Sequence, residues 1–207
     1  MSKQDHWENV YRSKGAVNVS WYRPHLDRSL DLILQAGAGP DSRIIDVGGG
    51  ASTLVDDLLV RGFLYVTVVD LSASALEVAK TRLGERARGV TWLCGDITSL
   101  DLPPDSFDVW HDRAVFHFLT SEGDRRAYVE RVCRVVKQGG HVVMATFGPR
   151  GPERCSGLQV VRYSAEQLRD TFAPAFRLAA QGVERHVTPH GAGQEFVYCL
   201  FVRESSR

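Results

Sequence analysis

The stretch "RIIDVGGGAS", residues 43–52, decides the fold of this chain. Its first half is short, apolar and rich in β-branched residues, which predicts a strand buried on both faces. Gly48, Gly49 and Gly50 follow at once. Because glycine has no Cβ and adopts positive φ angles, they predict a tight turn that lets a ligand lie against bare backbone amides. A glycine turn can also have a purely structural reason.

Strand and helix patterns alternate outward from this turn over residues 43–147. Buried strands are predicted at 64–70, 89–96, 107–112 and 141–147, and helices at 53–62, 72–84 and 121–140. Such alternation requires a mostly parallel sheet with helices on both faces. Residues 175–187 and 195–203, joined by a Pro- and Gly-containing turn, predict a final antiparallel hairpin. Residues 5–14 and, after Pro24, residues 25–39 have helical spacing.

Composition narrows the class of protein. The chain has 207 residues, of which 43% are hydrophobic, so it can bury a sizeable core as one domain. Lys plus Arg and Asp plus Glu both number 25, which predicts neither a nucleic-acid nor a membrane partner. The four cysteines form no CxxC pair, and the N-terminal residues lack the apolar run of a signal peptide. We therefore expect a cytoplasmic protein with reduced thiols.

Two acids indicate what the glycine turn binds. Asp70 ends the second strand, twenty positions after Gly50, where an acid accepts hydrogen bonds from ribose hydroxyls. A dinucleotide fingerprint would place its third glycine at Thr53, so that fingerprint is incomplete. Asp46, just before the turn, would also repel a pyrophosphate. A nucleoside that carries a cation fits these residues better.

With these features the chain resembles the class I S-adenosylmethionine-dependent methyltransferases. The first motif of that family, an acid followed by Gly-x-Gly-x-Gly, is matched by "DVGGGAS" (residues 46–52), with Ser52 in place of the last glycine. Other matching segments are "CGDIT" (94–98), "LPPDSFDVWHDRAVFHFL" (102–119) and "VVKQGGHVVMATF" (135–147), the last with Lys137 and Gln138 where proline is usual. The resemblance implies a Rossmann-like, seven-stranded α/β sheet with helices on both faces, mostly parallel, whose last strand runs antiparallel in a C-terminal hairpin.

The resemblance also implies a cofactor and its site. The cofactor would be S-adenosyl-L-methionine, with Asp70 on the ribose, Asp96 on the adenine amino group, and Asp46 with the glycine amides on the amino-acid part. The implied donor site consists of Asp46, Gly48, Gly49, Gly50, Ser52, Asp70, Leu71, Asp96, Ile97, His111, Trp21 and Tyr22. His111, Asp112 and Arg113 are the implied catalytic residues. Strand alternation places His111 and Asp112 on opposite sides of the sheet.

The implied organisation is a single methyltransferase domain over residues 1–207. Residues 1–40 would form helices that cover or brace the site, and residues 41–147 the donor-binding core. Residues 148–207 would supply the acceptor-side loop, a helix and the terminal hairpin.

The acceptor implied by the resemblance is a small-molecule nucleophile, such as a thiol or a metalloid. A "D-R-A" sequence after the fourth strand and a "G-P" loop before a Ser-headed helix are similar to methyltransferases of the thiopurine and thiol branch. One alternative is a protein lysine methyltransferase of the same fold, although its "D-K-G-T" lysine and threonine are missing here. Another is a non-catalytic protein that only binds the donor.

Several residues keep two interpretations. His117 lies in an apolar run, which favours a packed histidine over a base. Arg113 either orients an anionic nucleophile or forms a structural ion pair with Asp112 or another neighbour. Cys155 either packs or binds a soft metalloid, with packing favoured.

Aromatic residues near the N-terminus have two interpretations as well. Trp7, Tyr11, Trp21 and Tyr22 are either a cover over the donor or part of the core. No metal site is expected, because the spacing of His186, His190 and Cys199 matches no zinc pattern.

Overall fold

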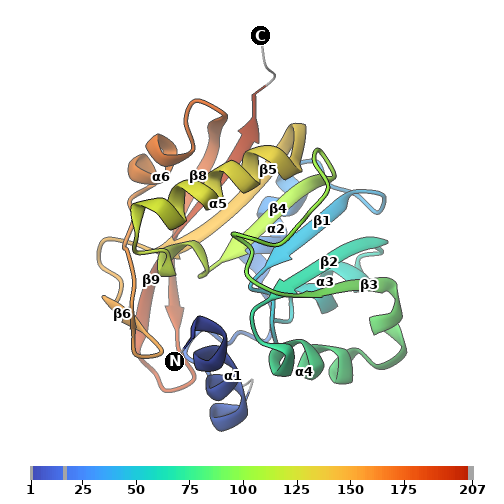
Figure 1. Cartoon of the computed structure of the whole chain (residues 1–207), viewed down its shortest axis with the longest axis vertical. Helices are drawn as coiled ribbons and strands as arrows, with labels where there is room; N and C mark the ends of the chain where they lie inside the picture. The colour runs from blue at the N-terminus through green and yellow to red at the C-terminus, as the bar shows by residue number, and fades with distance from the viewer. Residues whose placement is uncertain (1, 16–17, 205–207) are drawn as a thin grey trace.

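A computed structural model describes residues 2–15 and 18–204, and within them a seven-stranded sheet runs through the middle of the molecule (Figure 1). Its strands are β1 (Arg43–Val47), β2 (Tyr65–Asp70), β3 (Val90–Cys94), β4 (Phe107–Arg113), β5 (Val136–Phe147), β8 (Phe176–Val187) and β9 (Gly193–Arg203). The helices are α1 (Lys3–Lys14), α2 (Asp27–Gln35), α3 (Leu54–Val60), α4 (Ala73–Leu83), α5 (Glu122–Val135) and α6 (Ala165–Phe172), with 3-10 turns η1 (Gly84–Gly89) and η2 (Phe116–Phe118). A small hairpin of β6 (Arg154–Cys155) and β7 (Leu158–Gln159) stands apart from the sheet.

The strand order is β3-β2-β1-β4-β5-β9-β8. Strands β1 to β5 are parallel, whereas β9 is antiparallel to both β5 and β8. The predicted fold class, a mostly parallel α/β sheet with an antiparallel C-terminal hairpin, is confirmed. After β3 the chain crosses to the other side of β1, so the strand order reverses between β1 and β4. In open α/β sheets ligands bind at such a switch point, beyond the carboxyl ends of the strands.

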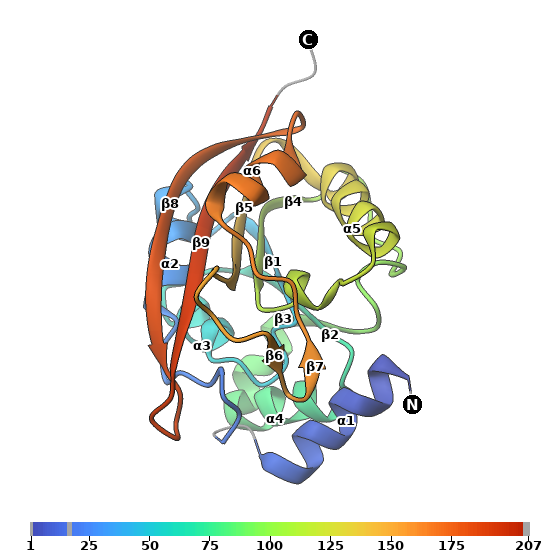
Figure 2. The same ribbon diagram turned by 90° about the vertical axis from the view of Figure 1, so that its left-hand side faces the viewer.

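Two apolar cores, one on each face of the sheet, hold the helices in place. Leu32 and Ile33 of α2 and Leu54 of α3 belong to the core on one face, and Tyr128 of α5 and Phe172 of α6 to the core on the other. In the side view, α2 and α3 lie on one side of the sheet and α5 on the other (Figure 2). Helices therefore cover both faces, as predicted, and the polar ends of the parallel strands are left for a ligand.

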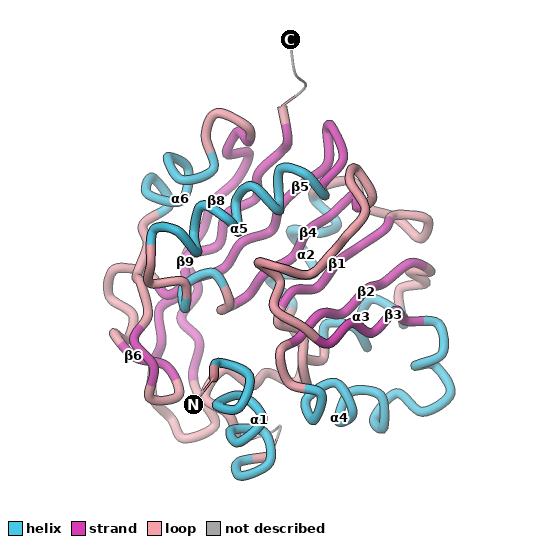
Figure 3. The backbone as a smooth tube through the Cα atoms, in the orientation of Figure 1, coloured by secondary structure: helices cyan, strands magenta, loops and turns pink. Residues whose placement is uncertain are grey.

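Several local boundaries differ from the prediction, among them the end of one helix and the start of another. The helix expected over 121–140 ends at Val135, and residues 136–140 already belong to β5, where Val136 pairs with Phe107 (Figure 3). Two consecutive β-branched residues favour a strand here, and Gly139, with φ +72°, does not continue a right-handed helix. Pro24 does not start the second helix, which begins at Asp27 after an N-cap at Leu26.

None of the helices in the described ranges 2–15 and 18–204 is long and apolar enough to span a bilayer.

Candidate functional site

The glycine turn after β1 is packed against the protein itself. A Cβ on Gly49 would lie 2.6 Å from both Asp46 Oδ2 and Val68 Cγ1, and one on Gly50 would lie 2.6 Å from Asp70 Oδ2. A Cβ on Gly48 would overlap the side chain of Val115. Because these positions are glycine, the carboxylates of Asp46 and Asp70 can pack directly against the backbone of the turn. The glycines also leave space for a ligand.

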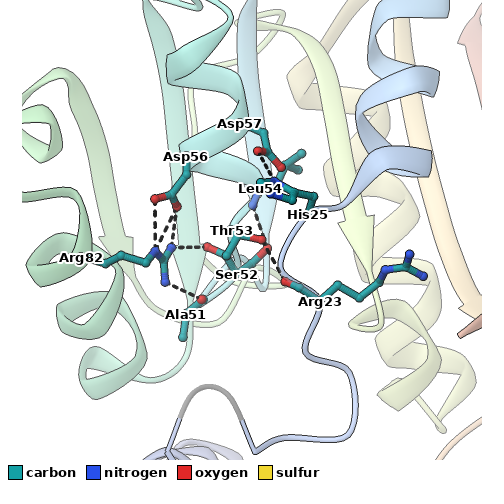
Figure 4. Close-up of polar contacts among 9 residues, drawn as sticks. All are labelled: Arg23, His25, Ala51, Ser52, Thr53, Leu54, Asp56, Asp57 and Arg82. Carbon is teal, nitrogen blue, oxygen red and sulfur yellow. Dashed lines mark hydrogen bonds and ion pairs between the residues drawn. The ribbon is translucent and has the colours of Figure 1, made fainter. Parts of the chain in front are cut away.

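An arginine from a neighbouring helix holds the far end of this turn (Figure 4). Arg82 of α4 donates 2.9 Å to the carbonyl oxygen of Ala51 and 2.6 Å to that of Ser52, and it pairs with Asp56 at 2.7 Å. Thr53 Oγ1 donates 3.1 Å to the carbonyl oxygen of Arg23, which ties the turn to the segment before α2. The turn is therefore anchored from two sides.

A buried chain of three polar side chains reaches from α2 to the glycine turn. His111 Nδ1 lies 2.7 Å from Asp46 Oδ1, and His111 Nε2 lies 2.9 Å from Ser29 Oγ. All three residues are at most 2% exposed. The other oxygen of Asp46, Oδ2, is buried without a hydrogen-bond partner among the described residues. A donor group of a bound ligand would satisfy this buried acceptor.

Acids also lie at the carboxyl ends of the next two strands, with Asp70 as the last residue of β2 and Asp96 two residues after β3. Asp70 Oδ1 accepts from Ser72 N at 2.8 Å, and Asp96 Oδ1 accepts from Thr98 N at 2.9 Å. Burial raises the pKa of Asp70 to about 7, and the negative charges of Asp46 and Glu8 add to this shift. Hydroxyl donors from a ligand would stabilise the charged form of Asp70.

Two adjoining clefts open at the carboxyl ends of the strands. The larger cleft has a volume of about 860 Å³, part of it open to solvent, and its wall includes Asp70, Leu71, Asp96, Ile97, Trp7 and Phe118. The smaller cleft, of about 460 Å³, is lined by residues that include Asp46, Gly49, Ser52, Tyr22 and His111. Gly48, Tyr11, Trp21 and Arg113 line both. Of the predicted donor residues, Gly50 alone lines neither cleft.

Asp112, one of the implied catalytic residues, lines neither cleft. It is fully buried on the face of the sheet opposite His111, where it accepts from Val115 N at 2.9 Å, from Phe116 N at 3.1 Å and from the Tyr128 hydroxyl. Burial raises its pKa to about 6. Through these hydrogen bonds Asp112 holds the turn that follows β4.

Arg113 ends β4 and points to the junction of the two clefts. The suggested ion pair with Asp112 is not found, because its partners are Tyr198 Oη at 3.0 Å and the carbonyl oxygen of Trp21 at 3.0 Å. The next residue, Ala114, has φ +73°, an unusual conformation for alanine that turns the chain sharply after Arg113.

Aromatic side chains from the N-terminal helix reach the larger cleft. The ring of Trp7 lies edge-on to Phe118 at 5.0 Å and to Trp21 at 5.7 Å. Helix α1 rests on α4, where Glu8 accepts from Ser74 N at 3.2 Å, and both helices lie at the bottom of Figures 1 and 2. These aromatic residues thus line the cleft and also pack together, so the two interpretations of them are compatible.

His117 is packed. It is fully buried, accepts from Phe147 N at 3.3 Å, and burial lowers its pKa to about 3, with the charge of Arg113 adding to this. Cys155 is buried at the wall of the larger cleft. Among the described residues, no cluster of three or more His, Cys, Asp or Glu side chains could hold a metal ion.

Sequence reasoning missed four residues of this region: Ser29, Arg82, Tyr198 and Glu8. The lone serine in the apolar run of α2 is a weak signal for a buried polar contact, and it is fully buried here. The other three contacts join distant parts of the chain and leave no local pattern.

Comparison with known proteins agrees with this geometry. Residues 45–144 match the family described as "Methyltransferase domain". The chain is 24% identical over 139 residues to the eEF1A lysine and N-terminal methyltransferase of Mus musculus, and 32% identical over 123 residues to an uncharacterized methyltransferase of Mycobacterium bovis. These matches cover 67% and 59% of this chain, but 20% and 58% of the two relatives.

Solved structures show the same fold over nearly the whole chain. One describes the conversion of a disulfide bond into a thioacetal group during echinomycin biosynthesis, with a TM-score of 0.74, 21% identity, and 97% of this chain and 93% of that chain covered. Another is 1,6-didemethyltoxoflavin-N1-methyltransferase of Burkholderia thailandensis with S-adenosylhomocysteine bound, with a TM-score of 0.68, 18% identity, and 98% and 84% covered. Over residues 45–144 the chain is thus similar to the methyltransferase-domain family, and nearly the whole chain shares the fold of these solved structures, one of which holds S-adenosylhomocysteine.

Proposed function

We propose that this chain transfers the methyl group of S-adenosylmethionine to a small-molecule nucleophile, such as a thiol or a metalloid, bound in the larger cleft. The observation that carries the proposal is the cleft itself, in which the acids that follow β2 and β3 meet an apolar chamber. The cleft is lined mainly by apolar and aromatic side chains with a few polar groups among them, which is typical of small-molecule sites. Trp7 of the N-terminal helix and Cys155 of the segment after β5 both line this chamber. Segments far apart in the chain therefore form its wall together.

The residues present fit the donor. The unpartnered Asp46 Oδ2 suits an ammonium group, and Asp70 and Asp96 suit hydroxyl and amino donors. Leu71, Ile97, Trp21 and Tyr22 would enclose the rest of the donor, beside Gly48, Gly49 and Ser52. Gly50 contributes by admitting the Asp70 carboxylate to the turn.

Bound S-adenosylmethionine supplies an electrophilic methyl group on a positively charged sulfur. The protein aligns the two reactants and excludes water, which by itself accounts for much of the rate of such a displacement. His111 acts as a positioning residue, because its contacts with Ser29 and Asp46 orient the Asp46 carboxylate. Asp112 holds the turn that directly follows Arg113.

The parts of the chain then divide the work. Residues 1–40 cover the site, residues 41–147 bind the donor, and residues 148–207 complete the acceptor side. This division and the assignment of a single domain to residues 1–207 belong to the proposal.

A donor labelled in its methyl group tests the proposal. The purified protein is incubated with this donor and a cell extract, and the label is separated into small-molecule, volatile and protein fractions. Label in the small-molecule or volatile fraction is the expected result. Label confined to protein would instead favour lysine methylation, which the eEF1A methyltransferase relative suggests, and no transfer at all would favour a protein that only binds the donor.

A further inference from the structure

The guanidinium of Arg113 is a buried cation whose partners are all neutral. Arg113 is 9% exposed, and its Nε and Nη1 donate to the Tyr198 hydroxyl and the Trp21 carbonyl oxygen. The ring of Phe196 lies 4.5 Å from its central carbon. Its remaining nitrogen, Nη2, is buried and has no hydrogen-bond partner among the described residues.

A buried charge without a counter-ion is costly, and folded proteins normally pair it. None of the ion pairs among described residues involves Arg113. Because Arg113 lines both clefts, the missing anion can come from a ligand bound there.

The other cations around the clefts are already paired. Lys3 binds Asp124 at 3.1 Å, and Arg23 binds Glu184. His117 and His186, which sense the charge of Arg113, have pKa values that burial lowers, so both are neutral near pH 7. Arg113 is therefore a cation of the cleft walls that has no charged partner among the described residues.

The chamber next to Arg113 is apolar and lined by aromatic rings that meet edge-on. Trp7, Trp21 and Phe118 contribute ring surfaces to the larger cleft, and Val115 and Leu119 complete the wall. Such a wall favours a planar apolar body over a sugar or a flexible polar chain.

We propose that the methyl acceptor binds as an anion, with its charged group on Arg113 Nη2 and a planar apolar body against Trp7, Trp21 and Phe118. The inference rests on the proposed function and narrows its substrate to small aromatic anions, thiolates among them. An anionic acceptor uses its own lone pair to form the bond to the methyl carbon. The bond between that carbon and the donor sulfur breaks, its electron pair stays on the sulfur, and two neutral products result.

This chemistry agrees with the groups near the junction, because an anionic acceptor leaves no proton to remove. The residues predicted to act on a proton are occupied: both ring nitrogens of His111 have partners, and Asp112 is saturated on the opposite face. Arg113 would favour the deprotonated acceptor as a nearby positive charge does for any acid.

The same anion-binding chemistry could serve the carboxylate of the donor, and binding experiments separate the two sources. The protein saturated with S-adenosylhomocysteine is titrated with benzoate and with its neutral analogue benzamide. We expect benzoate to bind about tenfold tighter or more, the range for a charged hydrogen bond. The variant Arg113→Met should lose this preference, and the control Arg177→Met, at an exposed arginine of β8, should keep it.

A second titration assigns the source of the anion. Arg113→Met should bind both S-adenosylhomocysteine and 5′-methylthioadenosine, which lacks the amino-acid part, within about twofold of the wild-type protein. If Arg113→Met lost affinity for S-adenosylhomocysteine but not for 5′-methylthioadenosine, Arg113 would bind the carboxylate of the methyl donor, and the proposal would be overturned. Equal binding of benzoate and benzamide by the wild-type protein would overturn it as well, and this comparison needs no variant to fold.

These outcomes are distinguishable from failure of the proposed function. If label from the methyl donor reaches only protein while benzoate is still preferred, the small-molecule assignment fails and the anion site stands. If small molecules are methylated but benzoate binds no tighter than benzamide, the proposal of an anionic acceptor is overturned and the proposed function is retained.

Discussion

Replacing Gly49 by alanine places a methyl group into a space that the protein already fills. The added Cβ would lie 2.6 Å from Asp46 Oδ2 and 2.6 Å from Val68 Cγ1, whereas ordinary contacts lie at 3.4–4 Å. Neither neighbour can retreat freely, because Asp46 is held by His111 and Val68 is buried within β2. Gly49 does not have a positive φ angle, so the clash is tested without added backbone strain.

Overpacking of this kind costs about 1–3 kcal/mol. In a chain of this size that corresponds to a melting temperature lower by roughly 2–12 °C. The displaced Asp46 carboxylate should also weaken the binding of S-adenosylhomocysteine. Thermal and urea unfolding give the stability, and calorimetric titration gives the affinity.

The matched control is Gly123→Ala in α5, where an added Cβ meets nothing within 4 Å. It should be neutral or stabilising by about 0.5–1 kcal/mol, since alanine favours the helix. If Gly49→Ala were as stable as this control and bound the ligand normally, the reasoning about the turn would be refuted.

Three further predictions concern charged groups near the turn. Burial raises the pKa of Asp70 to about 7, so between about pH 4 and pH 7 the carboxyl keeps its proton in the folded state but loses it in the unfolded state, and this contribution to stability falls as the pH rises. Relative to Asp70→Asn, the wild-type free energy of unfolding should therefore decrease from about pH 4 to about pH 7, and a constant difference would contradict the burial argument. The hydrogen bond to Asp57 raises the pKa of exposed His25, so the His25–Asp57 pair stabilises the fold below about pH 6.5 and loses this effect as the pH rises through the raised pKa. His25→Gln should therefore lower the melting temperature at pH 6 but not at pH 9, and an equal loss at both pH values would show that the His25–Asp57 pair does not stabilise the fold. Arg82→Ala removes the donors to the Ala51 and Ser52 carbonyl oxygens (Figure 4) and should weaken S-adenosylhomocysteine binding about two- to tenfold. The control Arg86→Ala, on the exposed η1 turn, should leave this affinity unchanged, and equal effects of the two variants would show that Arg82 does not hold the turn in its binding conformation.

The sequence predicted the sheet and the position of the glycine turn because both depend on local patterns. Apolar runs followed by Gly48 and by Asp70 mark the ends of two strands, and parallel pairing brings those ends together. The boundary at Val135 was missed because the sequence pattern alone does not show whether the pair Val135–Val136 ends a helix or begins a strand. Sheet pairing with Phe107 decides it.

Contacts between distant segments were beyond the reach of pattern. The bonds of Arg113 to Tyr198 and to the Trp21 carbonyl oxygen join residues 85 and 92 positions apart. Whether Arg113 pairs with Asp112 depends on which face of β4 each side chain occupies and on what already fills it. Strand alternation separated His111 from Asp112 correctly, yet only the packing of Tyr128 shows that Asp112 is saturated.

The most direct test of the account is a calorimetric titration of S-adenosylhomocysteine into the wild-type protein and two variants. Asp70→Ala removes the acid at the end of β2, and Asp101→Ala removes an acid whose side chain is 92% exposed. We expect one binding site in the wild-type protein, kept in Asp101→Ala and weakened severely in Asp70→Ala, with all three proteins folded. Equal affinity in Asp70→Ala, or no binding by the wild-type protein, would contradict the assignment of this cleft to the methyl donor.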